Sequence, residues 1–149
     1  MELREPVGRI LQHKGMTVHS IAPDLTVYEA LERMAQMDVG ALVVMDGADL
    51  MGVISERDYA RKVILKDRSS KEMKVSEIMS SPAVTVTPST TIDECMARMT
   101  DKRCRHLPVV DGAQVIGIVS IGDLVNWMIR AQDLTIHQLE DYISGRYPG

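Results

Sequence analysis

The chain has 149 residues, 45% of them hydrophobic, which is enough for one compact domain with its own core. Its formal net charge is −4, and aromatic side chains make up 3% of the composition, with no Phe. Proteins that wrap DNA need a basic surface, and binders of single-stranded nucleic acid need aromatic stacking surfaces, so we expect no nucleic-acid partner.

Local sequence disfavours three further classes of protein. Residues 1–6 are charged where a secretion signal would be hydrophobic. The longest hydrophobic stretches, such as residues 41–45, are far shorter than the ~20 residues of a membrane-spanning helix. Cys95 and Cys104 lie nine positions apart with no His at ligand spacing, so we expect no metal site. We therefore expect a cytoplasmic protein with no membrane partner.

The first expected element is a short amphipathic leader helix within residues 1–15, in which Val7, Ile10 and Leu11 form the hydrophobic side. Two interpretations of this leader stay open. It packs either on its own domain or on a second subunit, and the second of these favours a homodimer.

A repeat organises most of the remaining chain. A shift of 65 residues, without a gap, aligns the sequence with itself. The identical pairs include Thr26 with Thr91, Glu29 with Glu94, Gly52 with Gly117, Ser55 with Ser120 and Asp58 with Asp123. Two copies are too few for a solenoid. We therefore expect a pseudo-two-fold pair packed face to face, in which each copy closes the core of the other.

The repeat sets the expected domain boundaries. The two copies occupy residues 16–65 and 82–130, and a polar linker over residues 66–81 joins them. Residues 131–149 form a C-terminal helix and tail. In that helix a hydrophobic stripe of Ile136, Leu139 and Ile143 ends at Gly145, and the same two packing alternatives apply as for the leader.

Both copies predict the same order of elements, after a short first strand. Thr26 and Thr91 each begin a Thr-x-x-Glu capping box ahead of residues at helical spacing, which predicts a helix. Two short hydrophobic runs joined by Asp-Gly then predict a β-hairpin. The second strand leads directly into a helix that begins at Ser55 or Ser120. The fold class is therefore α+β, with the order β-α-β-β-α in each copy.

The strand-to-helix junctions are the candidate functional sites. Both have the form Gly-apolar-apolar-Ser-x-x-Asp, at residues 52–58 and 117–123. The start of a helix presents free backbone N–H groups that suit a phosphate, and an Asp carboxylate one turn later can accept from two adjacent ribose hydroxyls. A nucleotide would satisfy both. The alternative is a plain capping box between Ser and Asp, which needs no ligand.

Basic residues distinguish the two junctions. Arg57 lies at the first junction, and Arg105 and His106 come just before a predicted strand of the second copy. The matching positions of the first copy are Gly40 and Ala41. One cleft is therefore expected to be cationic and its counterpart apolar.

The combination of these motifs resembles the cystathionine-β-synthase (CBS) domain, present twice as a CBS pair. The resemblance covers roughly residues 16–130, and residues 55–63 and 105–109 are similar to small stand-alone bacterial CBS-pair proteins. Some of these are related to the regulatory module of inosine-monophosphate dehydrogenase. The resemblance implies a regulatory protein that binds an adenosine nucleotide, first AMP or NAD and then ATP. It also implies a homodimer whose geometry passes the bound state to an effector protein that the sequence does not identify.

The resemblance implies two clefts between the paired sheets, each made by the junction of one copy and the strand edges of the other. The residues implied for the first cleft are Ser55, Arg57, Asp58, Val86, Cys104, Arg105 and His106. Those implied for the second are Ser120, Asp123, Ile21, Val39, Gly40 and Ala41. Gly122 stands at the second junction where the first has Arg57, so we expect a charged nucleotide to bind less tightly there.

Two other functions stay open. A nicotinamide-dependent enzyme would need a nucleophile with its base, a metal set or a GxGxxG loop, and the sequence contains none of these, so no catalytic residue is predicted. A scaffold would use both junctions only as helix caps, and the pair would then serve for dimerisation or protein interaction without a ligand.

Overall fold

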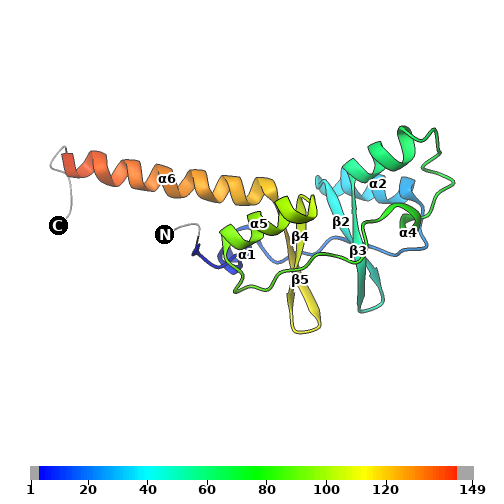
Figure 1. Ribbon diagram of the computed structural model, residues 1–149, viewed down its shortest axis with the longest axis horizontal. Helices are drawn as coiled ribbons and strands as arrows, with labels where there is room; N and C mark the ends of the chain where they lie inside the picture. The colour runs from blue at the N-terminus through cyan, green and yellow to red at the C-terminus, as the bar shows by residue number, and fades with distance from the viewer. Residues whose placement is uncertain (1–3, 144–149) are drawn as a thin grey trace.

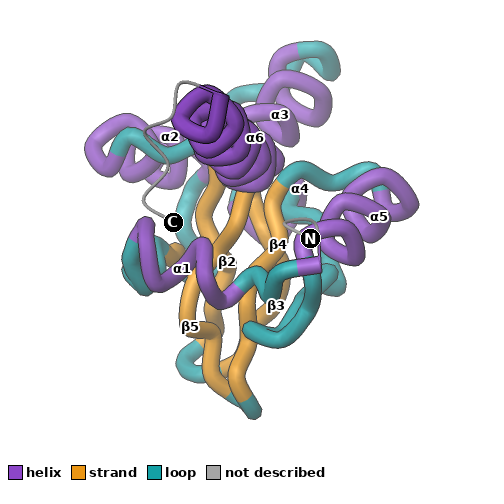
Figure 2. Tube along the Cα trace, turned by 90° about the vertical axis from the view of Figure 1, so that its left-hand side faces the viewer, coloured by secondary structure: helices purple, strands orange, loops and turns teal. Residues whose placement is uncertain are grey.

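Two β-hairpins form the centre of the molecule (Figures 1 and 2). The computed structural model describes residues 4–143, with the side chains of residues 4–132 and 140. In the first repeat, β1 (Ser20–Ile21), β2 (Ala41–Asp46) and β3 (Asp49–Ser55) form one sheet. In the second repeat, β4 (His106–Asp111) and β5 (Gln114–Ser120) form another. The predicted α+β class is confirmed.

Each hairpin has a two-residue turn that begins with glycine. Asp46 pairs with Asp49, and Asp111 pairs with Gln114. The first turn residues have positive φ values, +62° at Gly47 and +63° at Gly112. Glycine adopts this conformation without a steric penalty, as in type II′ hairpin turns. Both predicted hairpins are confirmed, with each Asp on the last paired position and each Gly inside the turn.

A helix precedes each hairpin: α2 (Val27–Met37) in the first repeat and α5 (Ile92–Lys102) in the second. Thr26 closes the predicted capping box, because its side chain accepts from the Glu29 N–H and its own N–H donates to the Glu29 carboxylate. Thr91 accepts from the N–H of Glu94. Its hydroxyl donates to Asp93, so the second predicted box is present only in the half in which Thr91 accepts from Glu94.

The two repeats pack through their sheets, as predicted. On β2, Leu42 and Val44 belong to the core of the first repeat, whereas Val43 between them is fully buried outside that core. Successive strand residues point to opposite faces, so Val43 lies on the other face of the hairpin. Pro108, which aligns with Val43 in the second repeat, is buried in the same way. These are the faces on which the sheets meet.

Each repeat has a separate hydrophobic core. The core of the first repeat includes Met73, Val75 and Ile78, which come from the segment around α4 (Val75–Ile78). These residues lie within the predicted linker, so the structure places residues 73–78 in the first repeat. The expectation that each copy closes the core of the other is wrong, since a short helical segment outside the repeat fills the open side of the core.

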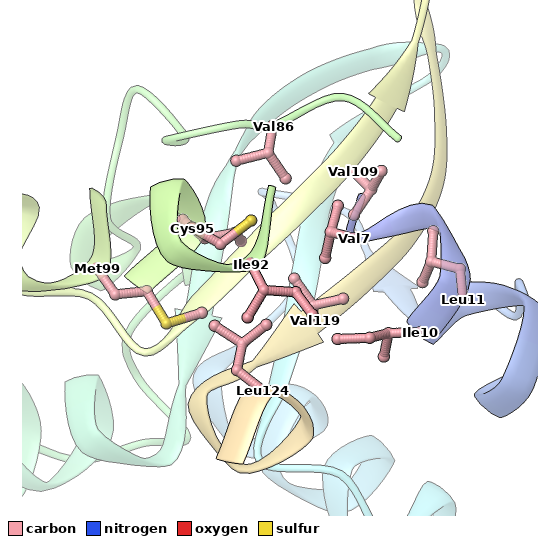
Figure 3. Close-up of a cluster of buried hydrophobic side chains, with 11 residues drawn as sticks. Val7, Ile10, Leu11, Val86, Ile92, Cys95, Met99, Val109, Val119 and Leu124 are labelled. Atoms are coloured by element: carbon pink, nitrogen blue, oxygen red, sulfur yellow. The ribbon is translucent and has the colours of Figure 1, made fainter. Parts of the chain in front are cut away.

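The core of the second repeat is closed in the same way by the N-terminal helix α1 (Gly8–Lys14). Val7, Ile10 and Leu11 are at most 4% exposed and point into this core, toward the β4–β5 hairpin and Leu124 (Figure 3). The leader therefore packs on its own chain. The second repeat is thus completed by α1, which precedes the first repeat in the sequence. The first repeat is completed by residues 73–78, which precede the second.

The glycine of each junction motif allows these closing segments to approach. A Cβ atom at Gly52 would lie 2.4 Å from the backbone oxygen of Ser80, and one at Gly117 would lie 2.7 Å from Cδ2 of Leu11. Neither distance leaves room for a side chain. The repeated glycine therefore has a packing role that explains its place in both motifs.

The repeats differ in their first strand and last helix. β1 pairs with β2 through two residues, whereas the predicted first strand of the second repeat is reduced to a single bridge between Val86 and Val109. After β3 comes α3 (Glu56–Tyr59), which continues as a π-helical segment, η2 (Ala60–Ile64).

After β5, α6 (Ile121–Ile143) runs for 23 residues and extends beyond the rest of the molecule (Figure 1). The expected boundary between residues 130 and 131 falls inside this helix, so the last helix of the repeat and the predicted C-terminal helix are one element. Gly145 and the side chains of Ile136, Leu139 and Ile143 lie outside the described part of the chain. Within residues 4–143, no helix combines the length and the hydrophobicity needed to cross a membrane.

Candidate functional site

A pocket of about 370 Å³ lies where the first junction faces the second repeat. Six of the seven residues predicted for the first cleft line it: Ser55, Arg57, Asp58, Cys104, Arg105 and His106. Three come from the start of α3 and three from the chain that leads into β4. The structure thus brings together the junction of one copy and the strand edge of the other.

Val86 is the exception among the seven. Its side chain is 1% exposed and belongs to the core of the second repeat. Its N–H donates to the Pro108 oxygen, and its oxygen accepts from the Val110 N–H. Val86 is therefore part of the packed sheet and not of the pocket lining.

Seven lining residues were not predicted for this cleft: Gly40, Val53, Glu56, Arg61, Lys62, Ser80 and Arg103. Arg61 and Lys62 follow Arg57 and Asp58 by four positions, and helical spacing would have revealed them. Arg103 has a left-handed backbone at the end of α5, with φ of 54°, and the chain reaches the pocket at this turn. This conformation has no clear sequence signal, since Arg103 is neither Gly nor Asn.

Asp58 holds the start of α3. Its Oδ2 accepts from the Ser55 N–H at 3.0 Å, and the Asp58 N–H donates to Ser55 Oγ at 3.2 Å. Ser120 and Asp123 repeat this arrangement at 2.8 and 3.1 Å. The capping box is therefore formed at both junctions.

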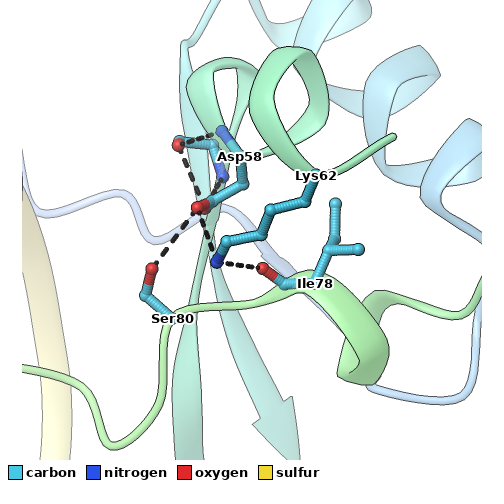
Figure 4. Close-up of polar contacts among 5 residues, drawn as sticks. Asp58, Lys62, Ile78 and Ser80 are labelled. Atoms are coloured by element: carbon cyan, nitrogen blue, oxygen red, sulfur yellow. Dashed lines mark hydrogen bonds and ion pairs between the residues drawn. The ribbon is translucent and has the colours of Figure 1, made fainter. Parts of the chain in front are cut away.

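The second carboxylate oxygen of Asp58 lies among polar groups of the pocket wall (Figure 4). Lys62 Nζ is 3.2 Å from Oδ1, and the Ser80 hydroxyl donates to the same atom over 3.4 Å. Lys62 also donates to the backbone oxygen of Ile78 at 2.8 Å. The long Ser80 contact and the half-exposed Lys62 side chain are groups that ligand hydroxyls could replace at Oδ1, while Oδ2 keeps the helix capped.

The backbone amides expected to bind phosphate are mostly in use. The Glu56 N–H donates to the Gly40 oxygen at 3.1 Å, and the Asp58 N–H is bound by Ser55. Attraction for an anion at this junction therefore comes from side chains.

Cationic side chains dominate the pocket lining. Five of them, Arg57, Arg61, Lys62, Arg103 and Arg105, stand against the two carboxylates of Glu56 and Asp58. They affect one another, since the Arg61 guanidinium lowers the pKa of Arg57, with smaller contributions from burial and from Arg105. A bound anion would relieve this repulsion, and guanidinium groups suit phosphate oxygens in particular.

Two lining residues are held neutral. Burial lowers the pKa of His106 below its usual value, and Lys14 and Arg105 add to this effect against the opposing carboxylates of Asp123 and Asp58. Burial also raises the pKa of the Cys104 thiol. Both groups are therefore uncharged at neutral pH, and they add polarizable surface to the pocket.

Four of the residues predicted for the second cleft come from the first repeat, as its strand edges. Ile21 and Ala41 are 2% and 4% exposed within its sheet. Val39 packs against the core of the first repeat, and Gly40 lines the pocket at the first junction. Their place in a second cleft stays a prediction.

The other two, Ser120 and Asp123, cap the start of α6. Asp123 also has a partner that the sequence did not suggest. The ammonium of Lys14, at the end of α1, lies 2.7 Å from Asp123 Oδ2 and donates to the Ile118 oxygen at 3.0 Å. The second junction is thus arranged around an internal ion pair.

Comparison with known proteins agrees with this architecture. The CBS domain family model matches residues 7–65 and 75–130. The CBS domain-containing protein CBSX3, mitochondrial, of Arabidopsis thaliana is 45% identical over 150 residues, which cover 95% of this chain and 73% of that protein. YhcV of Bacillus subtilis is 35% identical over 112 residues, covering 74% and 79% respectively.

Solved structures show the same fold. A protein with CBS domains from Burkholderia ambifaria has a TM-score of 0.81 and 48% identity, covering 85% of this chain and 96% of that one. The hexameric CBS-CP12 protein from bloom-forming cyanobacteria has a TM-score of 0.73 and 26% identity, covering 80% and 69%. With two matched segments, two repeated junctions and these relatives, the chain belongs to the CBS-domain family and carries two CBS domains as a CBS pair.

Proposed function

We propose that this CBS pair is a regulatory protein that binds an adenosine nucleotide at the first junction without chemical turnover. AMP and NAD are the leading ligands, followed by ATP. One observation carries the proposal: Asp58 and five cationic side chains converge from both repeats on a single pocket. A carboxylate suits the ribose hydroxyls, and arginines suit phosphate.

The remaining wall of the pocket suits the base. Val53, Cys104 and His106 supply uncharged surface, and the neutral imidazole can pack against a purine ring or exchange a hydrogen bond with it. Gly40 has no side chain, which leaves the pocket open beside His106. A Cβ atom at this position would enter that space, 3.8 Å from His106 Nε2 and 3.3 Å from Glu56 Oε1.

The position of the pocket supports a signalling role. Its walls come from both repeats, so a bound nucleotide would contact both and favour one relative arrangement of them. We propose that this arrangement changes the geometry of a homodimer and is recognised by an effector protein. The cyanobacterial relative is described as hexameric, which supports self-association of such a module. A cytoplasmic location is part of the proposal.

Thermal unfolding and calorimetry of the full chain with AMP, ADP, ATP, NAD, NADH and S-adenosylmethionine test this function. One adenosine ligand should raise the unfolding midpoint, because a ligand that binds only the folded state stabilises it by mass action. Arg105→Gln and Asp58→Asn should each weaken its binding about tenfold or more, since each removes a charged partner. Asn can still accept the capping hydrogen bond, so the fold is kept.

Arg9→Gln is the matched control, because Arg9 is exposed and pairs only weakly with Glu5, at 3.6 Å. It should bind nucleotide like the wild type. If no ligand shifts the midpoint, in protein shown to be free of co-purified nucleotide, the pair acts as a dimerisation scaffold. If the protein consumes a nucleotide unaided, the non-catalytic assignment is wrong.

A further inference from the structure

Lys14 reaches from α1 into the second junction. Its ammonium binds two groups at once, the Ile118 oxygen of β5 and Oδ2 of Asp123. The same oxygen atom of Asp123 also accepts from the Ser120 N–H at 2.8 Å. The side chain of Asp123 is 23% exposed, so the ion pair is partly shielded from water. Lys14 therefore lies between the strand and the aspartate, where the junction would receive a ligand.

The first junction has a different group in the same place. Ile118 aligns with Val53, whose oxygen accepts from the backbone N–H of Ser80 at 2.9 Å. The hydroxyl of Ser80 then lies 3.4 Å from Asp58 Oδ1. Ser80 thus links strand and aspartate at the first junction through its backbone N–H and its hydroxyl, and the ammonium of Lys14 links them at the second.

Lys62 differs from Lys14 in its position, although both lysines pair with a junction aspartate. It pairs with Asp58, but it comes from the same helical segment, four residues further on, and its ammonium is also held by the Ile78 oxygen. Lys62 itself lines the open pocket. It adds positive charge to a site that has four other cations.

The second junction has no such surplus of charge. The five cationic positions of the first pocket align, by the 65-residue shift, with Gly122, Asn126, Trp127, Asp38 and Gly40. None of these is basic, and one is acidic. Trp127 is tied to the N-terminal segment, since its indole donates to Glu5. Among the described residues, the aligned positions thus supply no cation for a phosphate at this junction, and the charge of Lys14 is already balanced by Asp123.

We infer that Lys14 determines which junction accepts a nucleotide: it occupies the second junction as a tethered cation, and the chain binds one nucleotide, at the first. This inference rests on the proposed function. Because Lys14 belongs to the same chain and is held at Asp123 by two hydrogen bonds, a free ligand competes with a tethered group. A nucleotide would have to separate the ion pair and bring its phosphate to a junction whose aligned positions carry no cation.

Adenosine is the sharpest probe, because it needs the aspartate but no cation. Titration of the full chain, followed by backbone amide NMR shifts, reports each junction separately through Asp58 and Arg105 or through Ile118 and Asp123. In the wild type, adenosine and AMP should shift only the first set. In Lys14→Ser, which copies the side chain of Ser80, adenosine should shift both sets, with binding at the second junction at least about tenfold tighter than in the wild type.

Two further variants complete the test. Lys14→Met removes the charge but keeps most of the side-chain length, and it should open the second junction less than Lys14→Ser. Lys71→Met removes one positive charge from a lysine that lies over the Tyr28 ring, and it should behave like the wild type. Saturable shifts at Ile118 and Asp123 in the wild type, or none in Lys14→Ser, would overturn the inference. If the first junction is silent in every protein, the proposed function fails instead, and the response of Lys14→Ser still decides the role of Lys14.

Discussion

The indole of Trp127 donates a hydrogen bond to the Glu5 carboxylate over 2.9 Å, although the two residues are 122 positions apart. The same region holds His13, whose ring meets Trp127 edge to face at 6.1 Å between centroids. These contacts tie α1 to the beginning of α6. The N-terminal segment is thus a structural part of the second repeat, at some distance from the repeat that follows it in sequence.

Leu11→Ala should destabilise the protein by about 2–4 kcal/mol, because Leu11 is 1% exposed and its truncation removes buried contacts and leaves a cavity beside Gly117. Urea denaturation followed by circular dichroism measures the change. Leu65→Ala is the control, since Leu65 is 76% exposed, and it should stay within about 0.5 kcal/mol of the wild type. Equal effects of the two substitutions would show that α1 is not part of the core.

Two glycine substitutions should separate stability from binding. Gly52→Ala should cost about 2–3 kcal/mol or more, because the new Cβ would lie 2.4 Å from the Ser80 backbone oxygen. Gly40→Ala should be nearly neutral for stability, since its Cβ would lie 3.3 Å from the end of the flexible Glu56 side chain. It should nevertheless weaken nucleotide binding by narrowing the pocket. Unfolding curves and calorimetry on both variants test this pair, and an unstable Gly40→Ala protein would contradict it.

His106 should make stability depend on pH. Its pKa is lowered in the folded state, chiefly by burial, so below pH 6.5 the unfolded chain binds more protons than the folded one. The stabilisation from the neutral, buried His106 ring is therefore complete above the pKa of His106 in the unfolded chain. It is lost as the pH falls toward the lower pKa of His106 in the folded protein. His106→Gln should flatten the pH dependence of the free energy of unfolding between pH 7 and pH 5. Parallel curves for the two proteins would rule out this contribution.

The two cysteines should react at different rates. Burial raises the pKa of Cys95 to about 11, and its side chain is fully buried, so it should resist a thiol reagent such as iodoacetamide in the folded protein. Cys104 is partly exposed and lines the pocket, so it should be modified first. Mass spectrometry after brief labelling distinguishes them, with Cys104→Ser as the control.

A saturating nucleotide should protect Cys104 from this reagent, because the ligand would cover the pocket lining. Unchanged labelling of Cys104 at saturation would place the ligand elsewhere. Labelling of Cys95 ahead of Cys104 would contradict the burial of Cys95 in the core of the second repeat.

Local patterns were sufficient for much of the fold. The Asp-Gly turns and the Ser-x-x-Asp junctions involve residues close in sequence, the 65-residue shift shows that each occurs twice, and all of them correspond to observed elements. The resemblance to the CBS domain then placed six of seven predicted residues in one pocket. The wider cationic lining goes beyond the prediction, because Arg61 and Lys62 lie one helical turn after the junction motif and Arg103 depends on an unusual backbone conformation.

Contacts between distant segments had no comparable signal. The hydrophobic spacing of Val7, Ile10 and Leu11 predicts a buried face but cannot say which repeat covers it. Lys14 and Asp123 are 109 positions apart, and nothing in the sequence around either residue indicates that they pair. The division of roles between the two junctions follows from this pair and was only partly visible in the replacement of Arg57 by Gly122.

The packing of α1 on the second repeat determines how the molecule would respond to force. A pull on the N-terminus acts on α1, whose side chains lie in the core of the second repeat, before any tension reaches the first repeat. The repeat that is later in the sequence would therefore carry the load first. In a single-molecule experiment with handles at the two ends, the order of rupture would run against the order of the chain.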